Sequence, residues 1–172
     1  MTDNQQILEK NEIGVLSNEL TYRHYLMNKG KVRELFRKMS MPEYLALHII
    51  AVESKASGVY SGRTYLKDLS EKMELTIHQT SKMIGDLRDR GLILWAHDGD
   101  GSEGTYVTIT ETGENLLSEQ ETLLKEYYGK VISKFGKQNL IELLRLMKQL
   151  ETVMSSELEE MEEVQMNDGI DE

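Results

Sequence analysis

The stretch 64–110 restricts the fold more than any other part of the chain, because its hydrophobic pattern changes from helical to extended within it. In its first part, apolar side chains at steps of three and four residues indicate the buried face of a short helix. These side chains are Leu66, Leu69 and Met73. Thr64 precedes them and is a suitable cap for that helix.

A second helix is predicted to begin at Thr76, where Thr76-Ile77-His78-Gln79 has the spacing of a capping box. Gly91 supplies the left-handed residue that ends a helix. The core positions between these two signals are Thr80, Met83, Ile84 and Leu87. The sequence therefore predicts two short helices in succession.

Extended structure is predicted after Gly91. Leu92–Ala96 is short and apolar, and Thr105–Ile109 is rich in β-branched and aromatic residues. Asp98-Gly99-Asp100-Gly101 supplies a turn between them. Two helices followed by a hairpin make a winged helix-turn-helix. Because such a unit buries little surface of its own, the rest of the chain is expected to form a frame that holds two copies at a fixed spacing.

Helices are predicted before this unit as well. A first helix covers Ile7 to about Asn28 and ends at Gly30, with Ile13, Leu16, Leu20 and Met27 on one face. Ser40-Met41-Pro42-Glu43 combines a capping serine, a reciprocating glutamate and a proline in the first turn. It predicts a second helix whose stripe is Leu45, Ile49 and Val52.

Two long helices are predicted after the unit. Thr110 caps one that runs through Leu116, Leu117, Leu123 and Leu124 to about Val131. After Gly136, the last helix has apolar residues at alternating steps of three and four, a coiled-coil pattern that requires a partner. They are Leu140, Leu143, Leu144, Met147, Leu150, Met154, Leu158 and Met161. The polar segment 164–172 is predicted to be disordered.

Composition limits the compartment and the chemistry. The 172 residues favour one domain. The absence of cysteine excludes thiol nucleophiles, disulfides and sulfur-based metal sites, and it fits a reducing compartment. The polar N-terminus lacks an apolar signal core, and no run reaches the roughly 18 apolar residues needed to span a bilayer. A soluble cytoplasmic protein with no membrane partner is expected.

The net charge of −10 argues at first against a nucleic-acid partner. However, residues 151–172 hold nine acids and no Lys or Arg, so residues 1–150 hold 21 acids against 20 bases. The excess of acid belongs to the C-terminal part. It does not exclude binding to DNA.

The order of these elements resembles that of the MarR/SlyA family of bacterial transcriptional regulators. LKDLSEKMELT is similar to the family's third helix and the turn after it, DLRDRGLI to its Leu-x-x-(Lys/Arg)-Gly-Leu-(Ile/Val) motif, and ITETG to its Leu-Thr-x-x-Gly motif. The resemblance covers nearly the whole chain and implies a mainly α fold with a small β-hairpin wing. It implies one domain over 1–163, with the winged helix-turn-helix at about 40–110 and dimerisation helices at about 5–38 and 111–163.

The resemblance also implies a function: a homodimer that binds double-stranded DNA as a repressor, on a pseudo-palindrome with half-sites about one helical turn apart. A small-molecule effector would release it by population shift. Lys82 is expected to meet phosphate or guanine edges, and His78 and Gln79 base edges. The full set of implied DNA contacts is Thr64, Thr76, Ile77, His78, Gln79, Ser81, Lys82 and Arg88.

The wing departs from the family pattern. Asp98 matches the family's acidic residue, but Ser102 and Glu103 stand where arginines contact the minor groove. Asp86 also occupies a position in the recognition helix that is often basic. Because phosphate repels carboxylates, the wing is expected to contribute little to DNA affinity.

Several side chains have two interpretations that the sequence leaves open. Gln79 either completes the capping box alone or also contacts a base. Arg88 and Arg90 are either ion-pair partners of Asp86, Asp89 or Glu71, or phosphate ligands. The basic run 29–38 is either a solvated helix face or a phosphate contact.

A ligand cleft is implied between the DNA-binding lobe and the dimer helices. Its candidate lining residues are Tyr25, Tyr44, His48, Tyr127 and Tyr128. The alternative is that these aromatic side chains pack helices together, with their hydroxyls at the surface.

Other functional classes have little support in the sequence. The four histidines are scattered without the close spacing of a metal site, so no metal or cofactor is predicted. No activated nucleophile, phosphate-binding glycine loop or catalytic carboxylate pair indicates an enzyme. The hypothesis that competes with a DNA-binding repressor is a winged-helix dimer that has lost DNA binding and acts through protein partners, using its acidic wing and tail.

Overall fold

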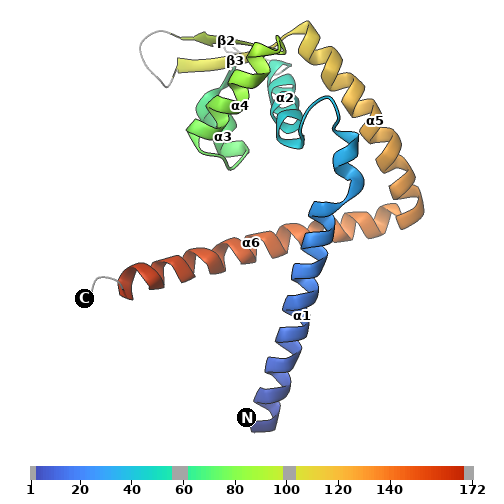
Figure 1. Ribbon diagram of the computed structural model, residues 1–172, viewed down its shortest axis with the longest axis vertical. Coiled ribbons are helices and arrows are strands. Elements are labelled where there is room, and N and C mark those ends of the chain that lie inside the picture. The colour runs from blue at the N-terminus through green and yellow to red at the C-terminus, as the bar shows by residue number, and fades with distance from the viewer. Residues whose placement is uncertain (1–2, 56–61, 99–103, 169–172) are drawn as a thin grey trace. The chain divides into compact units, whose positions relative to one another are not determined.

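The computed structural model describes residues 3–55, 62–98 and 104–168, and it is predominantly helical with one small antiparallel sheet (Figure 1). Two compact units divide the chain within its fifth α-helix, after Glu121. The elements of the first unit are α1 (Asp3–Lys29), the 3-10 helix η1 (Lys31–Leu35), α2 (Met41–Ser54), β1 (Thr64–Tyr65), α3 (Leu66–Lys72), α4 (Ile77–Asp89), β2 (Ile93–His97) and β3 (Thr105–Ile109). They are followed by α5 (Glu111–Phe135) and α6 (Lys137–Asp168).

The sheet has the strand order β1-β3-β2, with both pairs antiparallel. The predicted hairpin is confirmed as β2 and β3, whose register pairs Trp95 with Val107. Strand β1 was not predicted, because two residues are too short to show an alternating pattern. It pairs Thr64 with Val107. The prediction that Thr64 caps α3 is therefore wrong, and Tyr65 occupies the N-cap position without a side-chain hydrogen bond.

One hydrophobic core joins the sheet to α2, α3 and α4. The predicted stripes of α3 and α4 are confirmed: Met73 and Met83 are partly buried, and the other predicted core residues are buried. The largest fully buried apolar side chains are Leu47, Ile50, Leu69, Ile84, Leu87, Ile93 and Val107. The helix-turn-helix and the wing strands therefore form one packed body.

Helix α2 buries a different face from the one predicted. Of the predicted stripe, Ile49 is partly buried against the core, but Leu45 and Val52 are 46% and 57% exposed. The buried residues of the helix are Ala46, Leu47, Ile50 and Ala51. The sequence YLALHIIAV is apolar on nearly every side, so its period does not select a face. Packing in the core decides instead, and the two small residues Ala46 and Ala51 are part of the buried face.

The predicted helix starts are confirmed by their hydrogen bonds. The Ser40 hydroxyl accepts from the Glu43 N–H, and the Glu43 carboxylate accepts from the Ser40 N–H at 2.5 Å. The Thr110 hydroxyl accepts from the Gly113 N–H at 3.0 Å and donates to the Gly91 carbonyl at 2.7 Å. Gly91 has φ +70°, as a left-handed helix end requires. Thr110 thus joins the end of α4 to the start of α5.

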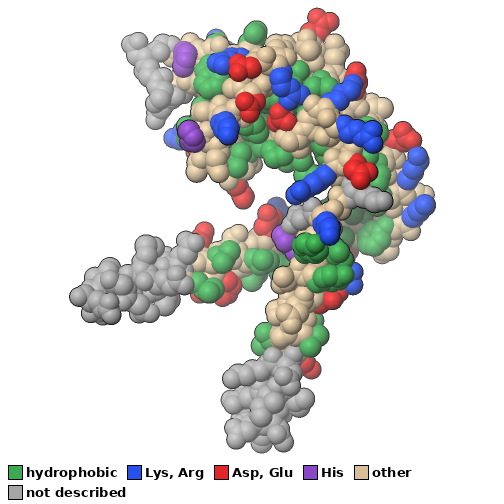
Figure 2. Space-filling view, viewed as in Figure 1, with side chains coloured by type: hydrophobic (Ala, Val, Ile, Leu, Met, Phe, Trp, Pro, Cys, Tyr) green, Lys and Arg blue, Asp and Glu red, His purple; other side chains and the backbone are tan. Residues whose placement is uncertain are grey.

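The terminal helices carry exposed apolar side chains (Figure 2). On α1 the predicted face of Ile13, Leu16, Leu20 and Met27 is 44–68% exposed. On α6 the exposed residues include Leu143, Leu144, Met147, Leu150, Met154, Leu158 and Met161. Helix α6 continues to Asp168, so the prediction of disorder is wrong for 164–168, and 169–172 lie outside the described residues. None of the described helices is long and apolar enough to cross a membrane.

The backbone of α5 at Gly113 lies close to Leu92 and to Ile109 of β3. A Cβ at this position would overlap the Leu92 carbonyl oxygen and lie 2.9 Å from Ile109 Cγ1, whereas a Cβ at Gly85 in α4 would meet nothing within 4 Å. Gly113→Ala is expected to lower the free energy of unfolding by roughly 1–3 kcal/mol, because the backbones must separate. Gly85→Ala is expected to raise it by about 0.5–1 kcal/mol through helix propensity. Urea unfolding measures both, and equal effects of the two substitutions would contradict this packing.

Candidate nucleic-acid interface

The exposed face of α4 lies opposite its core stripe. Because Thr80, Ile84 and Leu87 are fully buried, the remaining positions at the start of the helix face outward. Thr76, Ile77, His78, Gln79 and Lys82 are exposed, and Ser81 is half-buried. The structure thus brings six of the eight predicted contact residues together on one surface, and five of the six are exposed.

Gln79 has a structural role in the cap of α4. Its Oε1 accepts from the Thr76 N–H at 2.9 Å and from the Thr76 hydroxyl at 3.0 Å. The Gln79 N–H in turn donates to the Thr76 hydroxyl. A bidentate contact with adenine requires both the oxygen and the nitrogen of the amide. With its oxygen held by the cap, Gln79 can offer a base only its amide nitrogen.

The cations near α4 differ in how far they are engaged. Arg88 pairs with Asp89 at 2.8 Å and its guanidinium lies 5.9 Å from the Trp95 ring, as one of the two interpretations predicted. Arg90 pairs with Glu43 at 2.6 Å. Lys82 is exposed and makes no ion pair with any described residue. The same holds for Lys67 on α3, which no sequence motif marks.

Thr64 does not belong to this surface. Its side chain is fully buried in β1, and within the described part of the chain its hydroxyl has no hydrogen-bond partner. A buried side chain cannot reach a phosphate or a base edge. The predicted DNA contact at Thr64 is therefore wrong.

Asp98, at the base of the wing, is engaged within the protein. Its Oδ2 accepts from Arg63 Nη1 at 2.5 Å and from the Tyr65 hydroxyl at 2.8 Å. The bond to Asp98 is the main cause that raises the pKa of Tyr65. Loss of hydration lowers the pKa of Arg63, but its bonds to Tyr65 and Asp98 outweigh this effect and the pKa is raised. The ion pair joins residues 35 apart in sequence, so the chain gave no local signal of it.

The arginine of this ion pair also packs on the sheet. Its guanidinium lies 4.6 Å from the Tyr106 ring, and Tyr65 meets the same ring edge-on at 6.1 Å. The wing acid that the sequence compares with the family's therefore fixes the strands. Ser102 and Glu103, the other two wing residues singled out from the sequence, lie outside the described residues.

The basic run 29–38 is not one helix face. Its first residue, Lys29, is the last residue of α1. The rest of the run follows Gly30 and is divided between η1 and the loop after it. Lys38 pairs with Glu119 at 2.5 Å, and both side chains are more than 60% exposed. The predicted solvated helix face is wrong in its geometry, although Arg33 and Arg37 are exposed.

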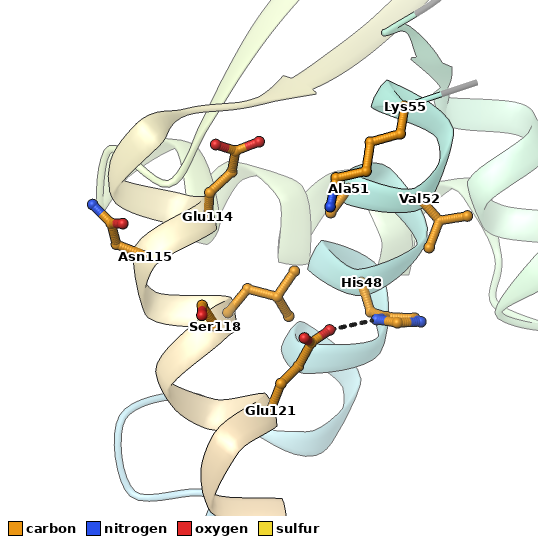
Figure 3. Close-up of a pocket in the computed structure, with 9 residues that line it drawn as sticks. His48, Ala51, Val52, Lys55, Glu114, Asn115, Ser118 and Glu121 are labelled. Atoms are coloured by element: carbon orange, nitrogen blue, oxygen red, sulfur yellow. Dashed lines mark hydrogen bonds and ion pairs between the residues drawn. The ribbon is translucent and has the colours of Figure 1, made fainter. Parts of the chain in front are cut away.

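A cavity of about 430 Å³ lies between α2 and the first turns of α5 (Figure 3). Glu121 of α5 reaches His48 of α2, with 3.1 Å between the carboxylate and Nδ1. The lining combines charged and polar groups with a few apolar side chains. It consists of His48, Ala51, Val52, Lys55, Glu114, Asn115, Leu117, Ser118 and Glu121.

Of the aromatic and histidine residues predicted for a ligand cleft, His48 alone lines this cavity. Tyr44 stacks on His48 and meets Phe36 edge-on, which is the packing role that the sequence left open. Lys29 lies over the ring of Tyr25 on α1. Tyr127 and Tyr128 contact each other on α5. The lining residues Glu114, Ser118 and Glu121 were not predicted from the sequence. Their spacing of four and three residues places them on one face of a helix, and this was the sequence signal that could have indicated them.

No protein-family model matches the sequence, and none of the curated proteins does. Solved structures do match. NMB1585, a MarR family regulator from Neisseria meningitidis, is 19% identical, with a TM-score of 0.55 and coverage of 93% of this chain and 99% of that one. MepR from S. aureus in its DNA-binding conformation is 13% identical, with a TM-score of 0.60 and coverage of 80% and 98%. The PcaV transcriptional regulator from Streptomyces coelicolor, in complex with its natural ligand, is 14% identical, with a TM-score of 0.61 and coverage of 81% and 91%.

The chain has the MarR-like winged-helix fold. The resemblance inferred from the three sequence motifs is confirmed at the level of the fold. In this MarR-like fold, α4 is the second helix of the helix-turn-helix, and β2 and β3 form the wing.

The buried hydroxyl of Thr64 gives a test of the packing around β1. Thr64→Val removes a buried hydroxyl that has no described partner and keeps the β-branched shape that suits a strand. The free energy of unfolding is expected to rise by about 1 kcal/mol, because an unsatisfied buried polar group is lost. Thermal unfolding measures the change. A destabilised variant would show that the hydroxyl has a partner.

Proposed function

We propose that this protein is a sequence-specific DNA-binding transcriptional regulator that acts as a homodimeric repressor. The observation that carries the proposal is the start of α4, which presents polar side chains on a helix fixed by its cap and its core. A rigid, exposed helix is the element with which helix-turn-helix proteins enter the major groove. The similar proteins named above support the proposal, since they are regulators and one was solved in a DNA-binding conformation.

The exposed residues at the start of α4 have distinct roles in this proposal. His78 reads a base edge, and Ile77, which is 49% exposed, offers an apolar contact to a thymine methyl. Lys82 meets phosphate or a guanine edge. The side chains of Thr76 and Gln79 fix the N-terminus of α4. The amide nitrogen of Gln79 can also donate one hydrogen bond to a base.

Electrostatics limit the affinity of this interface. Residues 40–110 hold ten acids against seven bases. Lys82 also shares a groove of about 490 Å³ with Glu43 and Asp86. Both signs of charge lie side by side on the winged unit in Figure 2. Because each neutralised phosphate adds about 0.9 to the salt slope, few contacts produce a shallow salt dependence. Specificity then depends mainly on contacts with bases.

The proposed dimer uses the exposed apolar faces of the terminal helices. The α6 residues with exposed apolar side chains repeat at steps of three and four, which is the pattern of helices that pair. A monomer that left this face in water would expose an unusually large apolar area. A dimer removes this exposure and fixes the spacing of two α4 helices, as a two-fold operator requires.

The cavity between α2 and α5 is the proposed effector site. Lys55 and His48 provide donors, Glu114 and Glu121 provide acceptors, and Val52 provides apolar surface. This mixture fits a small polar organic molecule. Occupancy would change operator affinity to the extent that the molecule favours one arrangement of the dimer. A compound that binds this site raises the melting temperature with its concentration, which a thermal-shift screen measures.

The competing function is a winged-helix dimer that acts on protein partners. The acid excess of residues 40–110 favours it, because acidic surfaces repel DNA. Binding-site selection with the purified protein distinguishes the two functions. Failure to enrich any duplex at low salt would support the protein-binding alternative and overturn the proposed repressor.

Lys82→Ala tests the phosphate contact directly. Affinity for all duplex sequences is expected to fall, and the slope of log K against log salt is expected to decrease by about 0.9. Fluorescence anisotropy over a salt series measures both quantities. Lys130→Ala is the matched control: it removes the same charge on α5, where Lys130 pairs with Glu126 one turn away. Equal effects of the two substitutions would contradict a specific role for Lys82.

The double substitution Leu150→Asp and Met154→Asp tests the dimer. These side chains are 40% and 49% exposed in the single chain, so the winged unit does not need them for its core. The mass in solution is expected to halve, because charge at a paired apolar face destabilises the pair. Light scattering after size exclusion measures the mass. An unchanged dimer mass would place the interface elsewhere.

A further inference from the structure

The segment before α2 is held from two sides by helices distant in sequence. We call residues 35–40 the bridging segment. On one side, Gln120 of α5 donates from Nε2 to the Leu35 carbonyl at 3.0 Å. On the other, Arg90 at the end of α4 donates from Nη2 to the Lys38 carbonyl at 2.7 Å. A short stretch of backbone therefore links α5 to the recognition helix.

Burial makes the α5 end of this connection firm. Gln120 is only 5% exposed. If its hydrogen bond to the Leu35 carbonyl were lost, water could replace that bond less easily than it could at a surface side chain. Met39, inside the bridging segment, is 3% exposed and belongs to the core. The nearby ion pair of Lys38 with Glu119 is exposed and adds little. The hydrogen bond of Gln120 is therefore the significant polar link on this side.

At the other end of this connection, Glu43 fixes the position of Arg90 at the end of α4. Its Oε1 accepts from Arg90 Nη1 at 2.6 Å, and its Oε2 accepts from the Ser40 N–H at 2.5 Å. Its side chain is 17% exposed. One carboxylate thus caps α2 and holds the C-terminal end of α4. Arg90 donates from Nη1 to Glu43 and from Nη2 to the Lys38 carbonyl, which favours an ion pair over a phosphate contact. The partner is Glu43, so the partners predicted for Arg90 from the sequence are wrong.

We propose that Gln120 and Arg90 are positioning residues that couple α5 to α4 through the bridging segment. Glu121, the residue after Gln120, lines the cavity, so a molecule in the cavity acts on the same turn of α5 that holds Leu35. A displacement of that turn moves the bridging segment and, through Arg90, the recognition helix. The regulatory part of this inference rests on the proposed function, whereas the mechanical coupling does not.

Trp95 reports on this coupling without DNA. It is the only tryptophan, it lies on β2, and Arg88 from the last turn of α4 lies over its ring. Gln120→Leu is expected to shift Trp95 emission in the same direction as Arg90→Gln, and the double variant no further than the larger single shift. Glu119→Gln is the control, because it removes only an exposed ion pair one residue away. Gln120→Met replaces the Leu variant if that variant does not fold.

Measured well below each melting temperature, these emission spectra decide the mechanical part. A wild-type spectrum for Gln120→Leu, or equal shifts for Gln120→Leu and Glu119→Gln, overturns the coupling. Such a result leaves the proposed DNA function untouched. Conversely, if binding-site selection enriches no duplex, the proposed DNA function is overturned, but the conclusion from Trp95 emission is unaffected.

DNA binding tests the regulatory part. Arg90→Gln is expected to weaken operator binding several-fold with an unchanged salt slope, since a phosphate ligand would instead reduce the slope by about 0.9. Gln120→Leu is expected to weaken it as well. If one path joins the two residues, the double variant loses less than the product of the single effects, by about twofold or more. Multiplicative losses, or a reduced slope for Arg90→Gln, overturn the proposal.

Discussion

The burial of one face of α4 is the constraint on which the rest of the structure depends. Thr80, Ile84 and Leu87 are fully buried in the core that α4 shares with α2, α3 and the sheet. Because a helix has a fixed period, burying this stripe decides which side chains face outward. The exposed set around His78 and Lys82 is a consequence of core packing, and the caps at Thr76 and Gly91 set where it begins and ends.

Local signals predicted the parts of the fold that local interactions determine. The capping boxes at Ser40 and Thr76, the stripe of α4 and the two wing strands all follow from neighbouring residues, and each is confirmed. The face of α2 was predicted wrongly because its sequence is apolar all round. Strand β1 exists only because β3 pairs with it, so it left no pattern.

In the candidate site, too, features set by neighbouring residues were predictable from the sequence, whereas features set by distant residues were not. Exposure of α4 residues was predictable, since it is the complement of a visible stripe. The engagement of the charged groups was not, because their partners are distant in sequence: Arg63 with Asp98, Arg90 with Glu43, and His48 with Glu121. The wing acid in particular is held by a strand that the sequence did not show, so its charge is partly compensated within the protein.

These distant pairs share one physical property. Each joins two elements through one or two directed bonds rather than through a broad apolar contact, and such bonds are either made or broken. The core around Leu47 and Ile84 resists gradual deformation because it is close-packed. A small displacement of α5 is therefore expected to pass along its polar contacts, at Gln120 and at Glu121, while the core moves as a rigid body. In the proposed complex with DNA, where the surface of α4 offers few cations, the position of α4 is then expected to control binding more strongly than its charge.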